Sequence, residues 1–211
     1  MEYVFQNDVR IYFLMNFVKG GELFKQIIDH KRFPEERARF YGAQVALALG
    51  HLHSQKILYR DLKPENILIG DDGYLFLADF GLSRMINRGE VALSFCGTAE
   101  YLAPEMIDGT GHHHGIDWWA LGILIYEMLV GIPPFYHKVR DHMFMLIKQA
   151  TVKYPDPDKH GICVSPVAQD IINKLLDKDM HTRLGSHGYA NEVLAHPFFA
   201  GINTDELLDK R

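Results

Sequence analysis

Four side chains that could together handle a proton, a phosphate and Mg²⁺ lie close in this sequence. Asp61, Lys63 and Asn66 fall in one short run, and Asp79 follows Asp61 by 18 residues. Phosphate transfer to an alcohol requires an oriented hydroxyl and neutralisation of the developing charge. Asp61 is placed to accept or orient the hydroxyl proton and Lys63 to reach the phosphate. Asn66 and Asp79 offer oxygens, the ligands that Mg²⁺ prefers.

The chain that must position these residues is predicted to be mainly α with a small antiparallel β insert. Short apolar runs at 57–58, 67–69 and 74–78 are typical of strands, and Gly70-Asp71-Asp72-Gly73 indicates a hairpin turn between the last two. The pattern predicts a strand at 10–18, and helices at 22–29, after Pro34, at 116–130, at 141–149 and after Ser165-Pro166. Residues 116–130 are apolar on all faces but shorter than the roughly 20 residues of a membrane span. We therefore expect a central buried helix.

Composition narrows the class of protein. The chain has 211 residues, of which 47% are hydrophobic and 23% charged, as in an ordinary globular domain. The net charge of −5 argues against a nucleic-acid partner. Two cysteines without a Cys-x-x-Cys motif, and no secretory signal, favour an intracellular, cytoplasmic protein without a membrane span. The adjacent His112-His113-His114 cannot all face one metal ion without distorting the chain, so we interpret them as a flexible loop.

Longer motifs carry a resemblance to protein kinases. They are Tyr59–Asn66, Ala78-Asp79-Phe80-Gly81, Phe95–Glu105 ending in Ala-Pro-Glu, Asp117–Gly122, and Arg183-Leu184-Gly185 ahead of His196-Pro197-Phe198-Phe199. Taken singly, the Asp61 and Asp79 motifs could be surface turns, but their order and spacing match the kinase signature. From about residue 10 to 202 the chain resembles the C-terminal lobe of a serine/threonine kinase of the AGC group, which includes cyclic-AMP-dependent, ribosomal-S6 and Akt-type enzymes.

The resemblance implies domain boundaries, cofactors and a nucleotide site. Residues 1–18 correspond to the last strands of the N-terminal lobe and the hinge, 19–202 to the C-terminal lobe, and 203–211 to the start of a tail. ATP and Mg²⁺ are the implied cofactors. Met15 would lie behind the adenine, Asn16–Val18 would form the hinge, and Leu68 would pack beneath the ring. Met15 and Leu68 could equally be plain core residues.

The resemblance also implies a substrate, a serine or threonine in a basic peptide or protein. Glu22, Glu65 and Glu127 would bind arginines that precede the target residue, although Glu22 and Glu127 could be ordinary solvated helix residues. An apolar pocket for the residue after the target would be lined by Phe95, Ala99 and Leu102. Thr98 would be a further substrate-site residue, and with Lys63 it disfavours a tyrosine kinase.

Regulatory and structural roles follow from the same resemblance. Ser94 would be phosphorylated by an upstream activating kinase, and Arg60 and Arg84 would bind the phosphate group on Ser94. Alternatively, Ser94 is only a solvated loop serine. A buried ion pair between Glu105 and Arg183 is implied. So is a structural role for Asp117, which would hold the backbone around Asp61.

Some parts of the kinase pattern are not found in these 211 residues. No Gly-x-Gly-x-x-Gly loop or Val-Ala-x-Lys strand precedes the hinge, and no AGC regulatory tail follows Phe199. We therefore expect part of an active serine/threonine kinase, and expect the chain alone to bind MgATP poorly and to be inactive. The alternative is a catalytically inactive lobe that serves as a binding module. Retention of all four candidate catalytic residues favours the first hypothesis.

Overall fold

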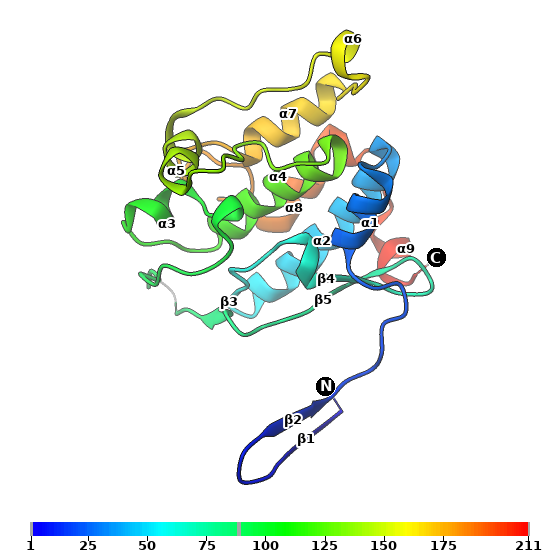
Figure 1. Cartoon of the computed structure of the whole chain (residues 1–211), viewed down its shortest axis with the longest axis vertical. Coiled ribbons are helices and arrows are strands. Elements are labelled where there is room, and N and C mark those ends of the chain that lie inside the picture. The colour runs from blue at the N-terminus through cyan, green and yellow to red at the C-terminus, as the bar shows by residue number, and fades with distance from the viewer. Residues whose placement is uncertain (1, 88–89, 211) are drawn as a thin grey trace.

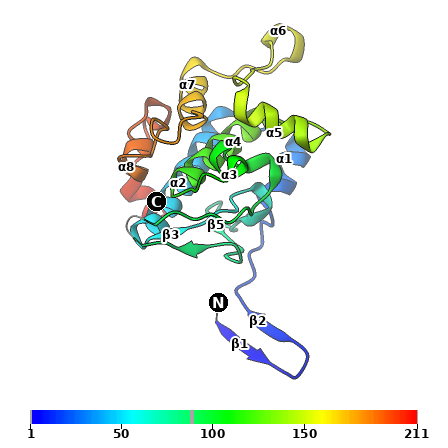
Figure 2. The ribbon, with the colours of Figure 1, turned by 90° about the vertical axis from the view of Figure 1, so that its left-hand side faces the viewer.

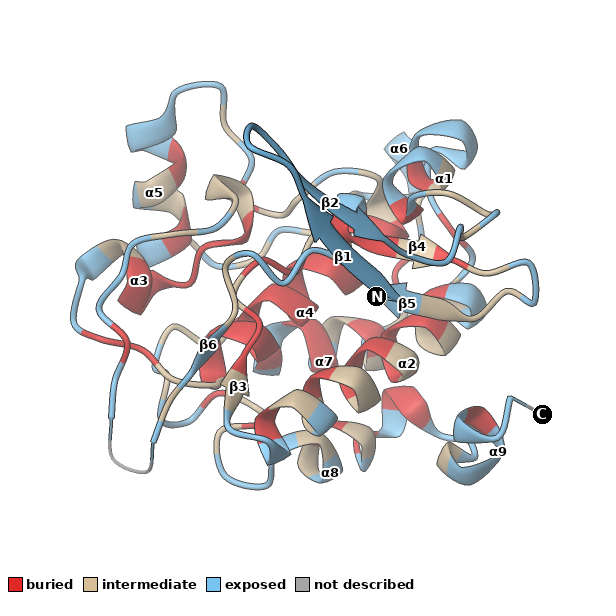
Figure 3. Ribbon diagram, turned by 90° about the horizontal axis from the view of Figure 1, so that it is seen from below, coloured by how far each residue is buried: buried red, intermediate tan, exposed pale blue. Residues whose placement is uncertain are grey.

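The computed structural model describes residues 2–87 and 90–210 and is built around one buried helix (Figure 1). That helix is α4, Gly115–Val130, in which every residue from Gly115 to Leu129 is buried. Figure 3 shows it within the buried interior of the molecule. The predicted buried helix is confirmed, and so is the mainly helical fold with small antiparallel sheets.

The remaining helices surround α4. They are α1 (Leu23–His30), α2 (Glu35–Ser54), α3 (Pro104–Asp108), α5 (Arg140–Gln149), α6 (Pro157–His160), α7 (Pro166–Leu175), α8 (Tyr189–Leu194) and α9 (Thr204–Leu208), with 3₁₀ turns at Pro64–Asn66, Ala99–Tyr101 and Pro197–Phe199. Helices α2 and α7 both pack on α4. The approach of α7 is close, because a Cβ added to Gly122 would lie 2.8 Å from the Cβ of Leu175.

Local sequence signals set the ends of two of these helices. The Ser165 hydroxyl accepts a hydrogen bond from the Ala168 amide at 3.2 Å, and Pro166 opens α7, as predicted. Helix α4 ends before the expected stop at Pro133-Pro134. Gly131 already adopts a left-handed conformation, with φ 96°, and its amide donates to the Glu127 carbonyl.

The structure contains three two-stranded antiparallel sheets among its described residues. They pair β1 (Tyr3–Gln6) with β2 (Ile11–Leu14), β3 (Ile57–Leu58) with β6 (Arg84–Met85), and β4 (Ile67–Ile69) with β5 (Leu75–Leu77). The predicted turn between β4 and β5 is present, and the Gly70 amide donates to the Tyr74 carbonyl at 2.7 Å. The strand predicted at 10–18 is confirmed only for Ile11–Leu14, because its partner strand starts at Tyr3, opposite Leu14.

The β1–β2 hairpin projects from the helical body (Figures 1 and 2). All eight residues of the two strands are exposed. An extended segment through Met15–Val18 leads from the hairpin to the body, where Gly20 and Gly21 exchange backbone hydrogen bonds with Ile69. None of the helices in the described ranges has both the length and the apolarity needed to cross a membrane.

Candidate active site

The loop at residues 59–66, between β3 and β4, is held in place by Asp117 of the buried helix α4. One carboxylate oxygen of Asp117 accepts from the Tyr59 amide at 3.0 Å, and the other accepts from the Arg60 amide at 2.9 Å. Asp117 is only 1% exposed and also bonds the ring of His53 at 2.8 Å. Arg60 has φ 70°, a conformation that is costly for a non-glycine residue. The contacts from Asp117 help to hold the loop in this shape.

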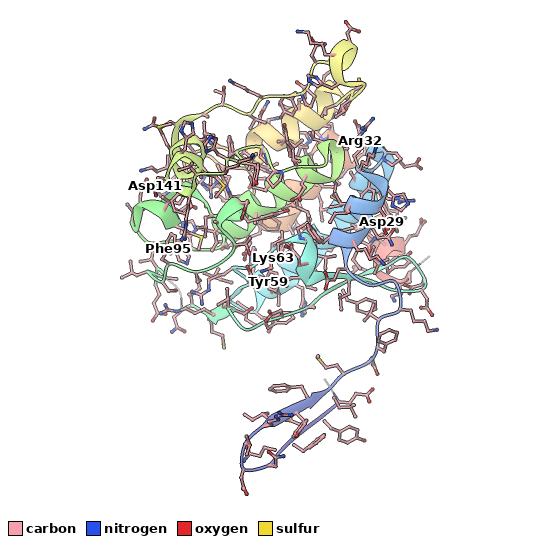
Figure 4. The ribbon with its side chains drawn as sticks, in the orientation of Figure 1. Asp29, Arg32, Tyr59, Lys63, Phe95 and Asp141 are labelled. Carbon is pink, nitrogen blue, oxygen red and sulfur yellow. The ribbon has the colours of Figure 1, made fainter. Side chains whose placement is uncertain are left out.

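Three side chains converge on the Asp61 carboxylate. Thr98 donates its hydroxyl to Oδ1 at 3.1 Å, and the Lys63 ammonium lies 3.0 Å from Oδ2. The amide nitrogen of Asn66 donates to the same Oδ2 at 2.9 Å and to the Asp61 carbonyl at 2.9 Å. Lys63 also donates to the Thr98 hydroxyl at 3.0 Å, which closes the network. Figure 4 shows Lys63 near the middle of the molecule. The Asp61 carboxylate is thus a hydrogen-bond acceptor that is held beside the Lys63 ammonium.

A cavity of about 1060 Å³ adjoins this network. It is lined by every residue that the sequence assigned to nucleotide or metal, namely Met15, Asn16, Val18, Leu68, Asn66 and Asp79. Met15 is 64% exposed, so it does not behave as an ordinary core side chain here. Asn66 belongs to both the Asp61 network and the cavity wall, because its side-chain amide donates to Asp61 and the residue also lines the cavity. The structure therefore puts the candidate catalytic and nucleotide residues side by side.

Asp79 lies at the cavity wall with its carboxylate exposed. Its φ is 51°, and its Oδ1 accepts from the Gly81 amide at 3.0 Å. The preceding Ala78 amide donates to the Asn66 carbonyl at 2.8 Å, which ties this turn to the 59–66 loop. The side-chain oxygens of Asn66 and Asp79, two residues that line this cavity, suit Mg²⁺. In proteins Mg²⁺ usually keeps waters and phosphate oxygens as its other ligands.

The prediction of a flexible loop at residues 112–114 is wrong, because these histidines pack against neighbouring residues and His112 is only 2% exposed. The His114 ring stacks on Tyr189 at 4.3 Å, and His112 exchanges backbone hydrogen bonds with Ala92 at 2.9 Å. Burial lowers the pKa of all three histidines, that of His114 to about 4, so they pack as neutral rings. Within the described ranges, no group of three or more His, Cys, Asp or Glu side chains is arranged to hold a metal ion.

The three predicted arginine-binding acids occupy different surroundings. Glu127 is 7% exposed and accepts a hydrogen bond from the Tyr101 hydroxyl. Burial raises its pKa to about 7, and the nearby charges of Glu65 and Glu100 act in the same direction. Glu65 and Glu127 are thus brought together, and Glu100 joins them. Glu22 precedes α1 and lies by Leu68 at the edge of a second cavity.

The predicted apolar pocket is only partly at the surface. Phe95 is 53% exposed, whereas Leu102 is 2% exposed and lies beneath the chain at Gly97. Ala99 is half-buried. The ring of Phe144, from α5, meets that of Phe95 edge-on at 6.2 Å. Phe144 and Glu100 are site residues that the sequence reasoning missed. Glu100 lies inside the quoted 95–105 block, whereas nothing local marked Phe144.

Of the two candidate phosphate-binding arginines, only Arg60 lies beside Ser94 in the part of the chain that the structure describes. Arg60 donates from Nη1 to the Ser94 hydroxyl at 2.6 Å and from Nε to the Leu82 carbonyl at 2.6 Å. Ser94 is exposed, so a kinase could reach it. Arg84 is exposed on β6, and no contact between Arg84 and Ser94 occurs in the described residues. Only the Arg60 half of the expected pair is in place.

Glu105 and Arg183 form a buried, two-pronged ion pair. The two guanidinium nitrogens lie 2.6 and 2.9 Å from the two carboxylate oxygens. Arg183 is fully buried and also donates to the carbonyls of Gly115 and Asp177, each at 3.0 Å. Arg183, which lies between α7 and α8, is therefore bonded to the start of α3 through Glu105 and to the start of α4 through the Gly115 carbonyl.

Comparisons with known proteins agree with this geometry. The family model described as the protein kinase domain matches residues 1–199. Serine/threonine protein kinase ypkA of Aspergillus fumigatus is 44% identical over 212 residues, which cover 100% of this chain and 32% of that protein. Serine/threonine-protein kinase sgk-1 of Caenorhabditis elegans is 44% identical, with 100% of this chain and 44% of that protein covered. Human serine/threonine-protein kinase Sgk2 is 43% identical, with coverages of 100% and 56%.

The chain thus spans about a third to somewhat over half of the length of these relatives. The match nevertheless runs through almost the whole of the chain. It includes all four residues around the Asp61 network and the cavity. The chain belongs to the protein kinase domain family, in the AGC group of serine/threonine kinases.

Proposed function

We propose that the protein containing this chain transfers the γ-phosphate of ATP to serine or threonine in basic peptide substrates. The observation that carries the proposal is the convergence of Thr98, Lys63 and Asn66 on the Asp61 carboxylate beside the large cavity. A non-catalytic module has no chemical need for an acceptor, a cation and two oxygen donors in one place.

In this proposal Asp61 orients the substrate hydroxyl and accepts its proton. The hydroxyl of Thr98 already donates to Asp61 at 3.1 Å, so the carboxylate is directed at a position where an alcohol can bind. Lys63 stabilises the negative charge that develops on the transferred phosphate. It is 21% exposed and therefore remains accessible from the active-site surface. These are contributions of position and electrostatics, the main ones available in phosphoryl transfer.

MgATP would be the co-substrate, bound in the cavity of about 1060 Å³. The backbone of Asn16–Val18 and the side chains of Met15 and Leu68 would contact adenine. Asn66 and Asp79 would offer oxygens to Mg²⁺, which supplies charge neutralisation on the phosphates when bound.

The peptide would bind with its arginines on the acidic side of the site. Glu65, Glu100 and Glu127 lie close enough to influence one another's charge, and Glu22 adds a fourth acid. Phe95 would contact the residue after the target. Ser94 would be the site at which an upstream kinase activates the enzyme, through Arg60. A cytoplasmic location fits such a substrate.

The test uses the full-length gene product with MgATP and a serine peptide that carries two upstream arginines. Phosphate transfer to the peptide is expected. The Asp61→Asn replacement should lower kcat by about 10²- to 10⁴-fold, because the lost carboxylate would accept the proton of the substrate hydroxyl in the transition state. Nucleotide affinity should hardly change. Asp29→Asn, an exposed acid on α1, is the matched control.

An inactive wild-type protein that still binds the peptide would instead support the binding-module alternative. A kcat unchanged by Asp61→Asn would remove Asp61 from the proposed role.

A further inference from the structure

Helix α5 is held firmly against the part of the chain that follows Ser94. Its Met143 and Ile147 side chains are 3% and 0% exposed. Near its end, Lys148 donates to Asp108, the last residue of α3, at 3.1 Å. The first turn of α5 therefore has a fixed position next to Phe95, and Figure 4 shows Asp141 of that turn above Phe95.

Arg140, the first residue of α5, lies over both rings of the aromatic pair. Its guanidinium carbon is 5.9 Å from the centroid of Phe95 and 5.1 Å from that of Phe144. Such contacts fix the direction of a long side chain while leaving its hydrogen-bond donors free for other partners. The cation is therefore held at the rim of the proposed pocket.

The charge of Arg140 is not neutralised by an ion pair with any residue that the structure describes. Arg140 is exposed, and in the described part of the chain no carboxylate lies within 4.0 Å of its guanidinium nitrogens. One of the acids proposed to bind arginines, Glu22, lies in another part of the molecule. Glu22 immediately precedes α1, and Figure 1 shows α1 and α5 on opposite sides of the molecule. The site thus has an acidic end and a cationic end.

We propose that Arg140 is a specificity-determining residue that selects an acidic side chain at the second position after the phosphorylated residue, and rejects a basic one there. This inference rests on the proposed kinase function. The first residue after the target would meet the apolar rings of Phe95 and Phe144. The next would reach the guanidinium that covers them, which can form a charge-assisted hydrogen bond with a carboxylate. The preferred substrate is therefore bipolar, basic before the target and acidic after it.

The experiment uses the full-length gene product and three peptides that differ only at the second position after the serine, carrying Glu, Gln or Lys. Each peptide has two upstream arginines and an apolar residue directly after the serine. Both kcat/KM and the binding constant, from fluorescence anisotropy, are measured. We expect the Glu peptide to exceed the Lys peptide by about tenfold, since attraction is exchanged for repulsion at an exposed site. The ratio should shrink at about 0.5 M salt.

Variants of one residue separate charge from structure. Arg140→Gln should bring the Glu-to-Lys ratio close to one, Arg140→Glu should invert it, and Arg140→Lys should retain much of it. Arg32→Gln is the matched control. Its guanidinium donates to the Gly161 carbonyl at 3.0 Å, and Figure 4 places it on the far side of the molecule from Phe95. That variant should keep the wild-type ratio.

The outcomes distinguish this inference from the function on which it rests. Transfer to all three peptides with equal efficiency would overturn the role of Arg140 and leave the kinase function standing. Absence of transfer to any peptide would overturn the function. The binding constants would then still decide whether Arg140 selects acidic peptides, because an unchanged ratio in Arg140→Glu contradicts it.

Discussion

At the scale of single residues, Glu127 has the most unusual chemistry in the proposed peptide site. It is buried, and burial disfavours its charged form, so its pKa rises to about 7. The hydrogen bond from Tyr101 opposes the shift, while Glu65 and Glu100 reinforce it. A substrate arginine needs the carboxylate form as its partner. If Glu127 binds a substrate arginine as proposed, peptide affinity should depend on pH in the neutral range.

We predict that the KM for a peptide with upstream arginines rises as the pH falls from about 8 to about 6. A group with pKa about 7 is mostly ionised at the upper pH and mostly protonated at the lower one. If only the ionised form binds arginine, affinity falls by about tenfold across this interval. Steady-state kinetics at constant ionic strength measure the profile.

Two comparisons separate Glu127 from the other groups that titrate in this range. Glu127→Gln should remove the extra pH dependence, and a peptide without arginines should lack it in the wild-type protein. A wild-type profile that remains equally steep in Glu127→Gln would assign the effect to another group.

The identities of the candidate catalytic residues could be predicted from the sequence, and the family resemblance implied some of the contacts, such as that of Glu105 with Arg183, but not all of them. Asp61, Lys63, Asn66 and Asp79 follow from short motifs, because their spacing along the chain is itself the signal. Phe144 and Glu100 were missed because their surroundings are set by tertiary structure: Phe144 meets the ring of Phe95, and the charge of Glu100 acts on Glu127, and neither relation leaves a local pattern.

At the scale of elements, the segment from Asp79 to Glu105 is attached to the 59–66 loop through Arg60 and Ser94. We predict that phosphorylation of Ser94 raises kcat/KM. The added charge of about −1.5 to −2 would strengthen the existing 2.6 Å contact with Arg60 and could recruit the exposed Arg84. The measurement compares phosphorylated and dephosphorylated full-length protein.

Ser94→Ala should abolish this difference, and Ser94→Thr should preserve it. Ser54→Ala, at the end of α2, is the control, since its exposed hydroxyl bonds only its near neighbours in sequence, donating to the His51 carbonyl and accepting from the Gln55 side chain. Equal activity of the phosphorylated protein and the Ser94→Ala variant would contradict the regulatory role.

A second element-scale prediction concerns the buried ion pair between Glu105 of α3 and Arg183, which lies between α7 and α8. Glu105→Gln removes the charge opposite Arg183, which is fully buried and cannot regain water. Loss of one partner of a buried pair typically costs about 3–5 kcal/mol. Urea unfolding should show a loss of that order. Asp71→Asn breaks the exposed pair with Lys19 and should cost less than about 1 kcal/mol. Similar losses in both variants would show that burial is not the cause.

The elements themselves were predictable where a local rule determines them. Helix α4 is apolar on all faces, and the cap at Ser165 begins α7 as expected. The predicted C-terminal limit of β2, residue 18, was wrong, because a strand ends where its partner strand does and Leu14 lies opposite Tyr3.

At the scale of the whole molecule, the proposed nucleotide cavity is bounded by parts that are packed to different degrees. Asn66, Leu68 and Asp79 belong to the packed helical body or its attached sheet, whereas Met15 and Phe17 lie on the extended segment and are 64% and 87% exposed. The hairpin beyond them is exposed in every residue. In residues 1–211 expressed alone, adenine would be contacted by a segment that little packing holds in place.

We therefore predict that the isolated 211-residue chain binds MgATP weakly, with a Kd of about 1 mM or above, and shows negligible turnover. Binding would have to order the Met15–Val18 segment, and that entropic cost lowers the net free energy of binding. Isothermal titration of residues 1–211 with MgATP gives the affinity, and a basic peptide assay gives the turnover. Asp79→Asn in the same chain distinguishes specific from nonspecific heat, because it should abolish any binding that depends on Mg²⁺. Micromolar affinity with steady turnover would mean that the exposed segment is already organised for nucleotide, and that the helical body with its hinge suffices for catalysis.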